Sequence, residues 1–354
     1  MRKNPVEEKA GANLHALCDD AIESAKSFEC ETFSVQTLFS KKELAKEDEY
    51  FDSLPLHRCM AAKNLLNAKA AKYIQKKSGK KYSREPDVIL GLDFANMRAE
   101  AKPQNIFIFG RYLKKSREYC QHLWACSACR GRGCKKCDFK KENYLSIEGS
   151  LAKIFAPAFE ATGAKLHASG REDVDVMNLG TGRPFILELS RPKKRKVALE
   201  PLAREFGSKF PLEALGLHFC PAFWVEAICT SHFDKHYRAS VSCASRPLTD
   251  ADFGRISSKI PSTLCQRTPI RVAARRADLL RHRRIYSLQL HNLEDGKLSM
   301  DLWAEAGTYI KEFVHGDEGR TVPSVSSILR EKCSCERLDV MGIDDGFIKT
   351  LRKY

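Results

Sequence analysis

One short charged stretch of the chain has residues that could do chemistry. Residues 168–176, ASGREDVDV, place Arg171, Glu172, Asp173 and Asp175 beside a glycine, directly before an apolar run typical of a strand. A guanidinium two residues before a carboxylate favours the ionised form of the acid and fixes its position. Asp173 is therefore a candidate nucleophile paired with Arg171. A decorated turn is the simpler interpretation, because Gly and Asp are common turn residues.

The same carboxylates permit a second chemistry. Asp173, Asp175 and Glu188 could together hold a divalent metal, as in two-metal nucleases. A lysine often follows the glutamate of such a site by two residues, and Ser190 stands there instead. A divalent-metal nuclease is thus an alternative that the sequence weakens.

Four cysteines form another candidate site. The segment CSACRGRGCKKC contains two C-x-x-C pairs, Cys126 with Cys129 and Cys134 with Cys137. Each pair directs its sulfurs to one point, and the glycines between the pairs let the loop fold back tightly. Four thiolates fit a tetrahedral zinc ion and leave no open position, so we expect a structural zinc knuckle.

The composition narrows the class of protein. The chain has 354 residues, a hydrophobic fraction of 43% and a formal net charge of +15. It is long enough for two domains, and its charge favours a polyanionic partner, with nucleic acid ahead of an anionic membrane surface. We find no apolar run of membrane-spanning length and no signal-peptide pattern. The 14 cysteines therefore indicate buried thiols and a metal site in a cytoplasmic protein, with the nucleus as the alternative location.

The elements that must position these residues differ between the two ends of the chain. The first ~115 residues are typical of a small α/β unit. Helical spacing predicts helices at 41–51 and 61–77, and apolar runs predict strands at 86–94 and 105–112, with ANMRAEAKPQ between the two strands.

From residue 146 onward, strands joined by short turns predominate over helices, which indicates an antiparallel α+β domain. Period-2 alternation at 284–292 and 297–303 predicts a hairpin, and Thr249 has helix-start chemistry. The remaining expected strands cover 183–189, 222–229, 237–243 and 337–343, and the expected helices cover 146–163 (disturbed at Pro157), 196–206, 249–260, 308–316 and 323–332.

Four longer stretches of the chain are distinctive: GREDVDV…LGTGRPFILEL, KHYRA, QRTPIRVAARRADLLRHRR and AGTYIKEFVHGDEGRTVPSV. Together they resemble one known family, the archaeal and eukaryotic tRNA pseudouridine synthases called the "Pus ten" family. The first stretch resembles the family's catalytic loop, in which the aspartate follows an arginine by two residues, and the other three are similar to further family blocks. CSACRGRGCKKC resembles the knuckle of archaeal members, and ETFSVQT and PDVILGLDF resemble the accessory THUMP-containing region.

The resemblance implies three parts. These are a THUMP-like RNA-binding domain at 1–118 with a reduced N-terminus, a four-cysteine zinc knuckle at 119–144, and a mostly antiparallel pseudouridine synthase domain at 145–354. It also implies isomerisation of uridine 54, uridine 55 or both in the T arm of tRNA, with no cofactor for catalysis and a structural zinc ion. The base must leave its stack to be reached. Whether the aspartate attacks C1′ or assists glycal formation stays open.

The resemblance also assigns roles to residues. Asp173 is the expected nucleophile, and Lys311 or Arg171 should pair with it. Tyr237 and Tyr309 are the expected substrate-contacting aromatic residues, with Ile328 or Leu329 as an apolar wall. The basic residues expected to follow RNA phosphates are Arg238, Arg271, Arg275, Arg276 and Arg281.

Some alternatives remain open. RPKKRK at 191–196 could follow phosphates or serve as a nuclear address, with equal weight. A non-catalytic tRNA-binding protein with a zinc knuckle is a third possible function. We expect a monomer, because a large bound tRNA needs no symmetry-related subunit.

Overall fold

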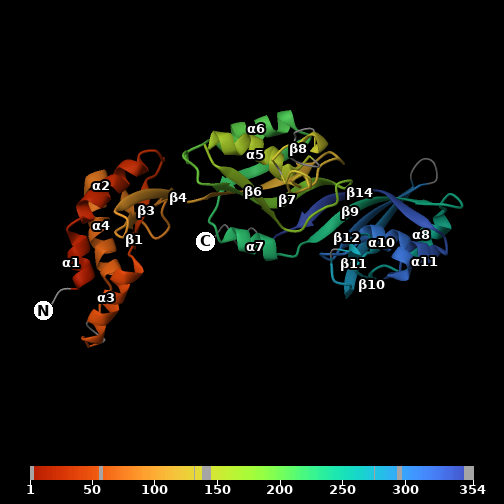
Figure 1. Ribbon diagram of the computed structural model, residues 1–354. Helices are drawn as coiled ribbons and strands as arrows, with labels where there is room; N and C mark the ends of the chain where they lie inside the picture. The colour runs from red at the N-terminus through yellow and green to blue at the C-terminus, as the bar shows by residue number, and fades with distance from the viewer. Residues whose placement is uncertain are drawn as a thin grey trace. The chain divides into compact units, whose positions relative to one another are not determined.

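The computed structural model describes residues 4–55, 59–130, 132–137, 145–274, 276–292 and 297–346. Two compact units divide the chain (Figure 1): unit 1 comprises residues 1–106, 155–164 and 188–198, and unit 2 comprises the remainder. Both units combine helices with sheets, so the predicted α+β class is confirmed. The three-part division at residues 118 and 144 stays a prediction. None of the described helices has the length and apolarity needed to span a membrane.

Unit 1 is built around a four-stranded sheet with the order β2-β1-β3-β4. The pairs β1–β2 and β1–β3 are parallel, and β3–β4 is antiparallel. Its core contains Leu17, Phe33, Leu66 and Leu90, each at most 2% exposed. Its elements are α1 Pro5–Gly11, α2 Leu14–Ala25, β1 Thr32–Leu38, α3 Lys41–Asp52, α4 Ala62–Ser78, β2 Lys81–Tyr82, β3 Val88–Asp93 and β4 Arg98–Pro103.

The α/β prediction for the N-terminal part is confirmed up to residue 106, but the strand expected at 105–112 is β5 Ile106–Lys114 of the second sheet. The residues between the two expected strands contain a further strand, the edge strand β4. Charged residues and a terminal Pro103 hide this strand in the sequence, and an edge strand tolerates both because one side of it stays unpaired. A THUMP function for unit 1 stays a prediction.

The basic run at 191–196 belongs to unit 1, where acidic side chains take up much of its charge. The Arg195 guanidinium lies 3.0 Å from the Asp87 carboxylate and donates to the Gln104 carbonyl at 2.8 Å. Lys196 pairs with Glu31, and Lys194 with Glu160 at 2.9 Å. Part of the run that the sequence offers as a phosphate track is therefore held by carboxylates of its own unit.

Unit 2 contains most of a second sheet with the order β13-β10-β11-β12-β9-β14-β7-β5-β8, in which β6 also pairs with β7. Its strands are β5 Ile106–Lys114, β6 Gly163–Ala168, β7 Met177–Ser190, β8 Leu212–Phe219, β9 Asp234–Cys243, β10 Ser262–Arg267, β11 Leu280–Asn292, β12 Leu298–Ala304, β13 Thr321–Val322 and β14 Cys333–Asp344. The predicted hairpin is confirmed, because β11 and β12 pair antiparallel with Leu288 opposite Leu302.

A short parallel joint links the two halves of this sheet. β14 pairs parallel with β7 through Asp339 opposite Met177 and Val340 opposite Asn178, whereas β14 pairs antiparallel with β9. Gly180 allows the close approach: it has φ +60°, and a Cβ placed there would lie 1.7 Å from the Met341 carbonyl oxygen. Any larger residue at position 180 would force the strands apart.

Helices cover this sheet and carry part of the site. The α-helices are α5 Ile147–Ala158, α6 Leu199–Lys209, α7 Trp224–Thr230, α8 Asp250–Ser257, α9 Ile270–Ala273, α10 Ile310–His315 and α11 Val325–Leu329, and the 3-10 turns are η2 Lys135–Cys137 and η4 Asp317–Gly319. The helix start at Thr249 is confirmed by its capping box with Asp252. In Figure 1, α8, α10 and α11 lie together beside the β9–β14 half.

One predicted strand is wrong. Most of residues 222–229 belong to the helix α7 Trp224–Thr230 instead, and Trp224 and Ile228 are its buried residues. These two side chains are four residues apart and so share one helical face. The high content of Phe, Trp, Val and Ile favours a strand in the sequence, but burial on only one helical stripe determines the structure.

Candidate functional site

The charged stretch forms a turn between β6 and β7. Gly170 has φ +69°, a conformation that residues with a Cβ rarely adopt, and a Cβ there would also lie 3.3 Å from Arg183 Nη1. Beyond the glycine, the side chains of Glu172 and Asp173 have different environments, with Glu172 buried and Asp173 39% exposed. We call residues 169–175 the catalytic turn, after the role that the sequence predicts for Asp173.

Two cations hold the Asp173 carboxylate. Arg271 Nη1 donates to Oδ1 at 3.0 Å and to Oδ2 at 2.8 Å. Lys311 Nζ lies 3.5 Å from Asp173 Oδ2 and 2.8 Å from Asp175 Oδ2. The hydrogen bond from Lys311 lowers the pKa of Asp175, although burial, the largest influence, acts in the opposite direction. Both carboxylates thus face positive side chains.

The structure does not pair Arg171 with Asp173 as expected. The Arg171 guanidinium lies over the Trp124 ring, 5.7 Å from its centroid, while Arg271 occupies the Asp173 carboxylate. Only Glu172 lies between Arg171 and Asp173 in the turn, whereas Arg271 approaches from α9, 98 residues away in sequence. Proximity in the sequence therefore pointed to the wrong arginine.

Beneath the turn lies a set of buried polar side chains that we call the buried floor: Tyr112, Lys114, Gln121, Glu172 and Arg183. Arg183 and Glu172 form an ion pair at 2.8 Å, with both side chains at most 2% exposed. Tyr112 Oη donates to the same carboxylate at 2.9 Å. Burial works against the charge of Arg183, but Glu172 raises the pKa of its guanidinium.

The other members of the floor hold the backbone of the turn. Lys114 is fully buried, and its Nζ donates to the carbonyl oxygens of Asp173 at 3.0 Å, Val174 at 2.8 Å and Tyr119 at 2.9 Å. Gln121 Nε2 donates to the Gly170 carbonyl at 3.0 Å. Because the main chain on both sides of Glu172 is tied down, the side chain of Asp173 projects from a rigid support.

A cavity of about 570 Å³ opens in front of Asp173, within the size range of small-molecule pockets. Tyr237 from β9 and Tyr309 at the start of α10 both line it, as the resemblance implies for the substrate-contacting residues. Burial raises the pKa of Tyr237 to about 12, so its phenol is neutral. Arg276 Nη1 donates to Tyr309 Oη at 3.2 Å.

The apolar wall of the cavity comes from other residues than expected. Leu329 is 3% exposed in the main core of unit 2, and neither it nor Ile328 lines the cavity. Leu338 and Val340, on alternate positions of β14, supply apolar surface there together with Val176. Their period-2 spacing in RLDVMGI was the signal that could have found them.

Lys235 also lines the cavity and is absent from the residues that the sequence singled out. Its side chain is almost buried, and its Nζ donates to the Phe233 carbonyl at 2.6 Å. Burial lowers the pKa of Lys235 to about 8, and Arg183 adds to this lowering. A cavity lysine with so low a pKa titrates close to neutral pH.

The five arginines expected on RNA are distributed unevenly. Arg271 and Arg276 line the cavity. Arg238 lies on β9 and is held by two hydrogen bonds to Asp301, at 2.7 and 2.8 Å. Arg281 donates to Thr268 Oγ1 at 3.0 Å outside the cavity lining, and Arg275 lies outside the described residues.

The carboxylates of the nuclease alternative do not gather. Asp173 and Asp175 belong to unit 2 and are paired with Arg271 and Lys311, whereas Glu188 belongs to unit 1, where Asn105 donates to it at 2.6 Å. Among the residues that the structure describes, the cysteine cluster is the only group of His, Cys, Asp and Glu able to hold a metal. The described geometry therefore speaks against a metal nuclease.

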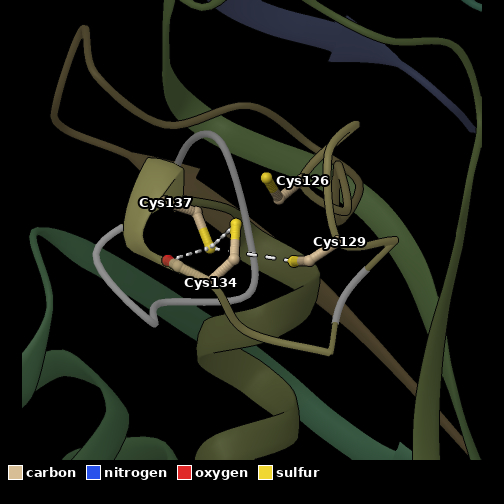
Figure 2. A group of neighbouring side chains, drawn as sticks. All are labelled: Cys126, Cys129, Cys134 and Cys137. Carbon is tan, nitrogen blue, oxygen red and sulfur yellow. Dashed lines mark hydrogen bonds between the residues drawn. The ribbon is translucent and has the colours of Figure 1, made fainter.

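The four cysteines do converge, as Figure 2 shows. Their sulfur atoms all lie within 4.8 Å of one another. The distances from Cys137 Sγ are 3.8 Å to Cys129 Sγ and 3.9 Å to Cys134 Sγ. Tetrahedral zinc with Zn–S bonds of ~2.3 Å places its sulfurs about 3.8 Å apart, so this donor set fits zinc.

Comparisons with known proteins agree on one family. Residues 107–344 match the family model described as "Pus10, C-terminal". A protein of Methanocaldococcus jannaschii named tRNA pseudouridine synthase Pus10 is 35% identical over 334 residues, which cover 94% of this chain and 73% of that protein. A protein of the same name from Archaeoglobus fulgidus is 35% identical over 333 residues, or 93% of this chain and 92% of that one.

The similarity to solved structures is weak. A structure titled "Crystal Structure of a Cbf5-Nop10-Gar1 Complex" aligns with a TM-score of 0.36 at 14% identity, over 66% of this chain and 48% of that chain. No conclusion rests on a likeness of this size.

Proposed function

The chain belongs to the Pus10 family, and we propose that it isomerises uridine to pseudouridine in tRNA. The observation that carries this proposal is the carboxylate of Asp173. It is held between Arg271 and Lys311 at the edge of a cavity that two tyrosines also line. A nucleophile needs such a partly exposed carboxylate on a rigid support.

The reaction is an isomerisation, so it needs no second reactant. The bond between N1 of uracil and C1′ of the ribose breaks, and the detached base turns within the cavity. C5 then bonds to C1′, and the proton on C5 is lost while N1 gains one. Asp173 either bonds covalently to C1′ in the interval or assists removal of a ribose proton. Arg271 and Lys311 balance its charge in both routes.

The cavity suits a base that has left its stack. Extrusion costs unstacking energy, which contacts with the extruded nucleotide must offset. Tyr237 and Tyr309 offer aromatic rings, and Leu338 and Val340 offer apolar surface. Arg276 at the cavity edge could meet a phosphate, which would make binding sensitive to salt.

The substrate position that we propose is uridine 54, uridine 55 or both in the T arm of tRNA. The excess of positive charge over the chain, +15, suits a folded polyanion. Recognition by the shape of the folded RNA fits this charge better than reading of base edges, because A-form grooves hide those edges. Unit 1 would then contribute RNA affinity, and the active form would be a monomer.

For the cysteine cluster we propose a structural zinc ion held by Cys126, Cys129, Cys134 and Cys137. Four thiolates leave no position for a substrate or a reacting water, and the cluster does not line the cavity. Brief treatment of the folded protein with EDTA should therefore leave turnover unchanged. Loss of turnover within seconds of adding chelator would contradict a purely structural ion.

The direct test is tritium release from tRNA labelled with [5-³H]uridine. Wild-type protein should release tritium, and Asp173→Asn should reduce release by at least ~10³-fold while the tRNA affinity changes by less than about twofold. Asp301→Asn is the matched control, because Asp301 is also held by two hydrogen bonds from one arginine but lies outside the cavity. Full turnover by Asp173→Asn would refute the assignment.

Two other results would separate the alternatives. Tight tRNA binding by a wild-type protein that releases no tritium would favour a non-catalytic binding protein. RNA cleavage that requires magnesium would revive the nuclease.

A further inference from the structure

Glu312 is a buried acid directly behind the nucleophile. It follows Lys311 on α10, is 1% exposed, and does not line the cavity. Its Oε1 accepts a hydrogen bond from Arg271 Nε at 2.7 Å, and no donor within the described ranges reaches Oε2. A buried carboxylate is costly unless a cation compensates it. Here Arg271 provides that compensation.

One guanidinium therefore serves two carboxylates. Arg271 offers Nε to Glu312 and Nη1 to both oxygens of Asp173. The planar guanidinium has donors in a fixed fork, so fixing one edge fixes the direction of the other. Glu312 and Asp173 together raise the pKa of Arg271 despite its burial.

The backbone alone does not fix this arginine. Arg271 stands in α9, a helix of only four residues, and its side chain is 39% exposed. A long side chain on such a short element has many rotamers, most of which would point the guanidinium away from Asp173. The contact with Glu312 selects the rotamer that meets the nucleophile.

We propose that Glu312 is a positioning residue for the isomerisation, acting through Arg271 on Asp173. The proposal rests on the proposed function. When the Asp173 carboxylate forms a bond to C1′, it loses its negative charge. Glu312 then remains as the counter-ion of Arg271, so the guanidinium stays in place. Two consecutive residues of α10 then act on the catalytic turn, Lys311 by direct contact and Glu312 through the arginine.

The test is a double-mutant cycle measured with single-turnover tritium release at saturating enzyme. Glu312→Gln keeps the acceptor oxygen but loses the charge-assisted bond, and we expect a rate about 10-fold lower. Arg271→Gln should lower the rate about 100-fold. The double variant should match Arg271→Gln alone, because Glu312 then has no guanidinium to orient. The tRNA affinity of Glu312→Gln should change by less than about twofold.

Asp252→Asn controls for loss of stability. Asp252 is 2% exposed and accepts two hydrogen bonds from Arg246, at 2.6 and 2.9 Å, on α8 outside the cavity. This variant should lower the melting temperature at least as much as Glu312→Gln and leave the rate unchanged.

Three results would overturn the proposal: a wild-type rate for Glu312→Gln, losses that multiply in the double variant, or an equal slowing by Asp252→Asn. With active wild-type protein, each of these rejects only the positioning role. Wild-type protein that releases no tritium rejects the proposed function as well.

Discussion

Glu172 and Asp173 are neighbours in the chain with opposite surroundings. Glu172 points into the buried floor, where Arg183 and Tyr112 take up its carboxylate. Asp173 points to the cavity, where Arg271 and Lys311 lie against a side chain that stays 39% exposed. A single peptide unit separates an acid that supports the fold from one placed to react.

This difference shows how the protein can have a reactive acid on a turn without a flexible turn. A nucleophile must be open to the substrate, and an open turn is usually mobile. Here the neighbouring acid and the fully buried Lys114 anchor the main chain from below. Rigidity comes from the floor, and accessibility comes from the cavity face.

The largest predicted effect comes from removing Arg183, the cation of the floor that pairs with Glu172. Arg183→Met would leave Glu172 buried without a counter-charge, which costs about 3–5 kcal/mol of stability. Asp173→Asn should change stability by less than about 1 kcal/mol, because its carboxylate is partly exposed. Urea unfolding of both variants checks this contrast, and equal losses would contradict it.

Two lysines allow a matched comparison between the buried floor, which contains Lys114, and the cavity face, which contains Lys311. Lys114→Met strips three buried carbonyl oxygens of their donor and should cost about 2–3 kcal/mol of stability. Lys311→Met should cost less than about 1 kcal/mol but lower the single-turnover rate about 10- to 100-fold. Thermal melting and tritium release measure the two effects. A rate loss for Lys311→Met that only mirrors a stability loss would break the comparison.

Lys235 lies in the cavity wall, and its titration should make the free energy of unfolding depend on pH. Its pKa is about 8 in the folded chain against 10.5 ordinarily, since burial and Arg183 disfavour its charge while Asp234 and Glu172 favour it. Above pH 8 the unfolded chain binds a proton that the folded chain lacks, so stability rises with pH. From pH 7 to pH 9 the wild type should gain about 1 kcal/mol relative to Lys235→Met, by urea unfolding.

The range from pH 7 to pH 9 lies below the pH at which ionisation of Tyr237 affects stability. Burial raises the pKa of Tyr237 to about 12, so folding is disfavoured only above pH 10, where the unfolded phenol ionises. If the difference between wild type and Lys235→Met is constant from pH 7 to pH 9, Lys235 is not the titrating group.

The smallest predicted effect concerns two arginines from two basic runs. Arg276 lines the cavity, whereas Arg195 is held by Asp87 and Gln104 in unit 1. Arg276→Ala should weaken tRNA binding and reduce the slope of log affinity against log salt by about 1. Arg195→Ala should leave that slope unchanged. Equal slopes for both variants would remove the distinction between the runs.

Much of the fold could be predicted from patterns that the backbone itself imposes. The alternation in β11 and β12 and the capping box at Thr249 are local signals, and the structure confirms both. The strand prediction for the segment of α7 was wrong, because aromatic and β-branched residues favour a strand locally. Only the packing of Trp224 and Ile228 on one face determined a helix.

The candidate site was predictable to the extent that its residues are close in sequence. The catalytic turn and the cysteine cluster were visible as types and spacings. The role of Arg271 beside Asp173 was not, because 98 residues separate the two in the sequence. Leu338 and Val340 were missed for a related reason: their period-2 spacing shows that they share one face of β14, but only the tertiary structure shows that this face meets the cavity.

The parallel joint of β7 and β14 has a consequence for how the enzyme is made. Met177 donates to Asp339, 162 residues later in the chain. During synthesis Asp173, the proposed nucleophile, leaves the ribosome long before Lys311, and longer still before the strand that supplies Leu338 and Val340. A translation product that ends before residue 338 therefore lacks the part of the cavity wall that Leu338 and Val340 supply.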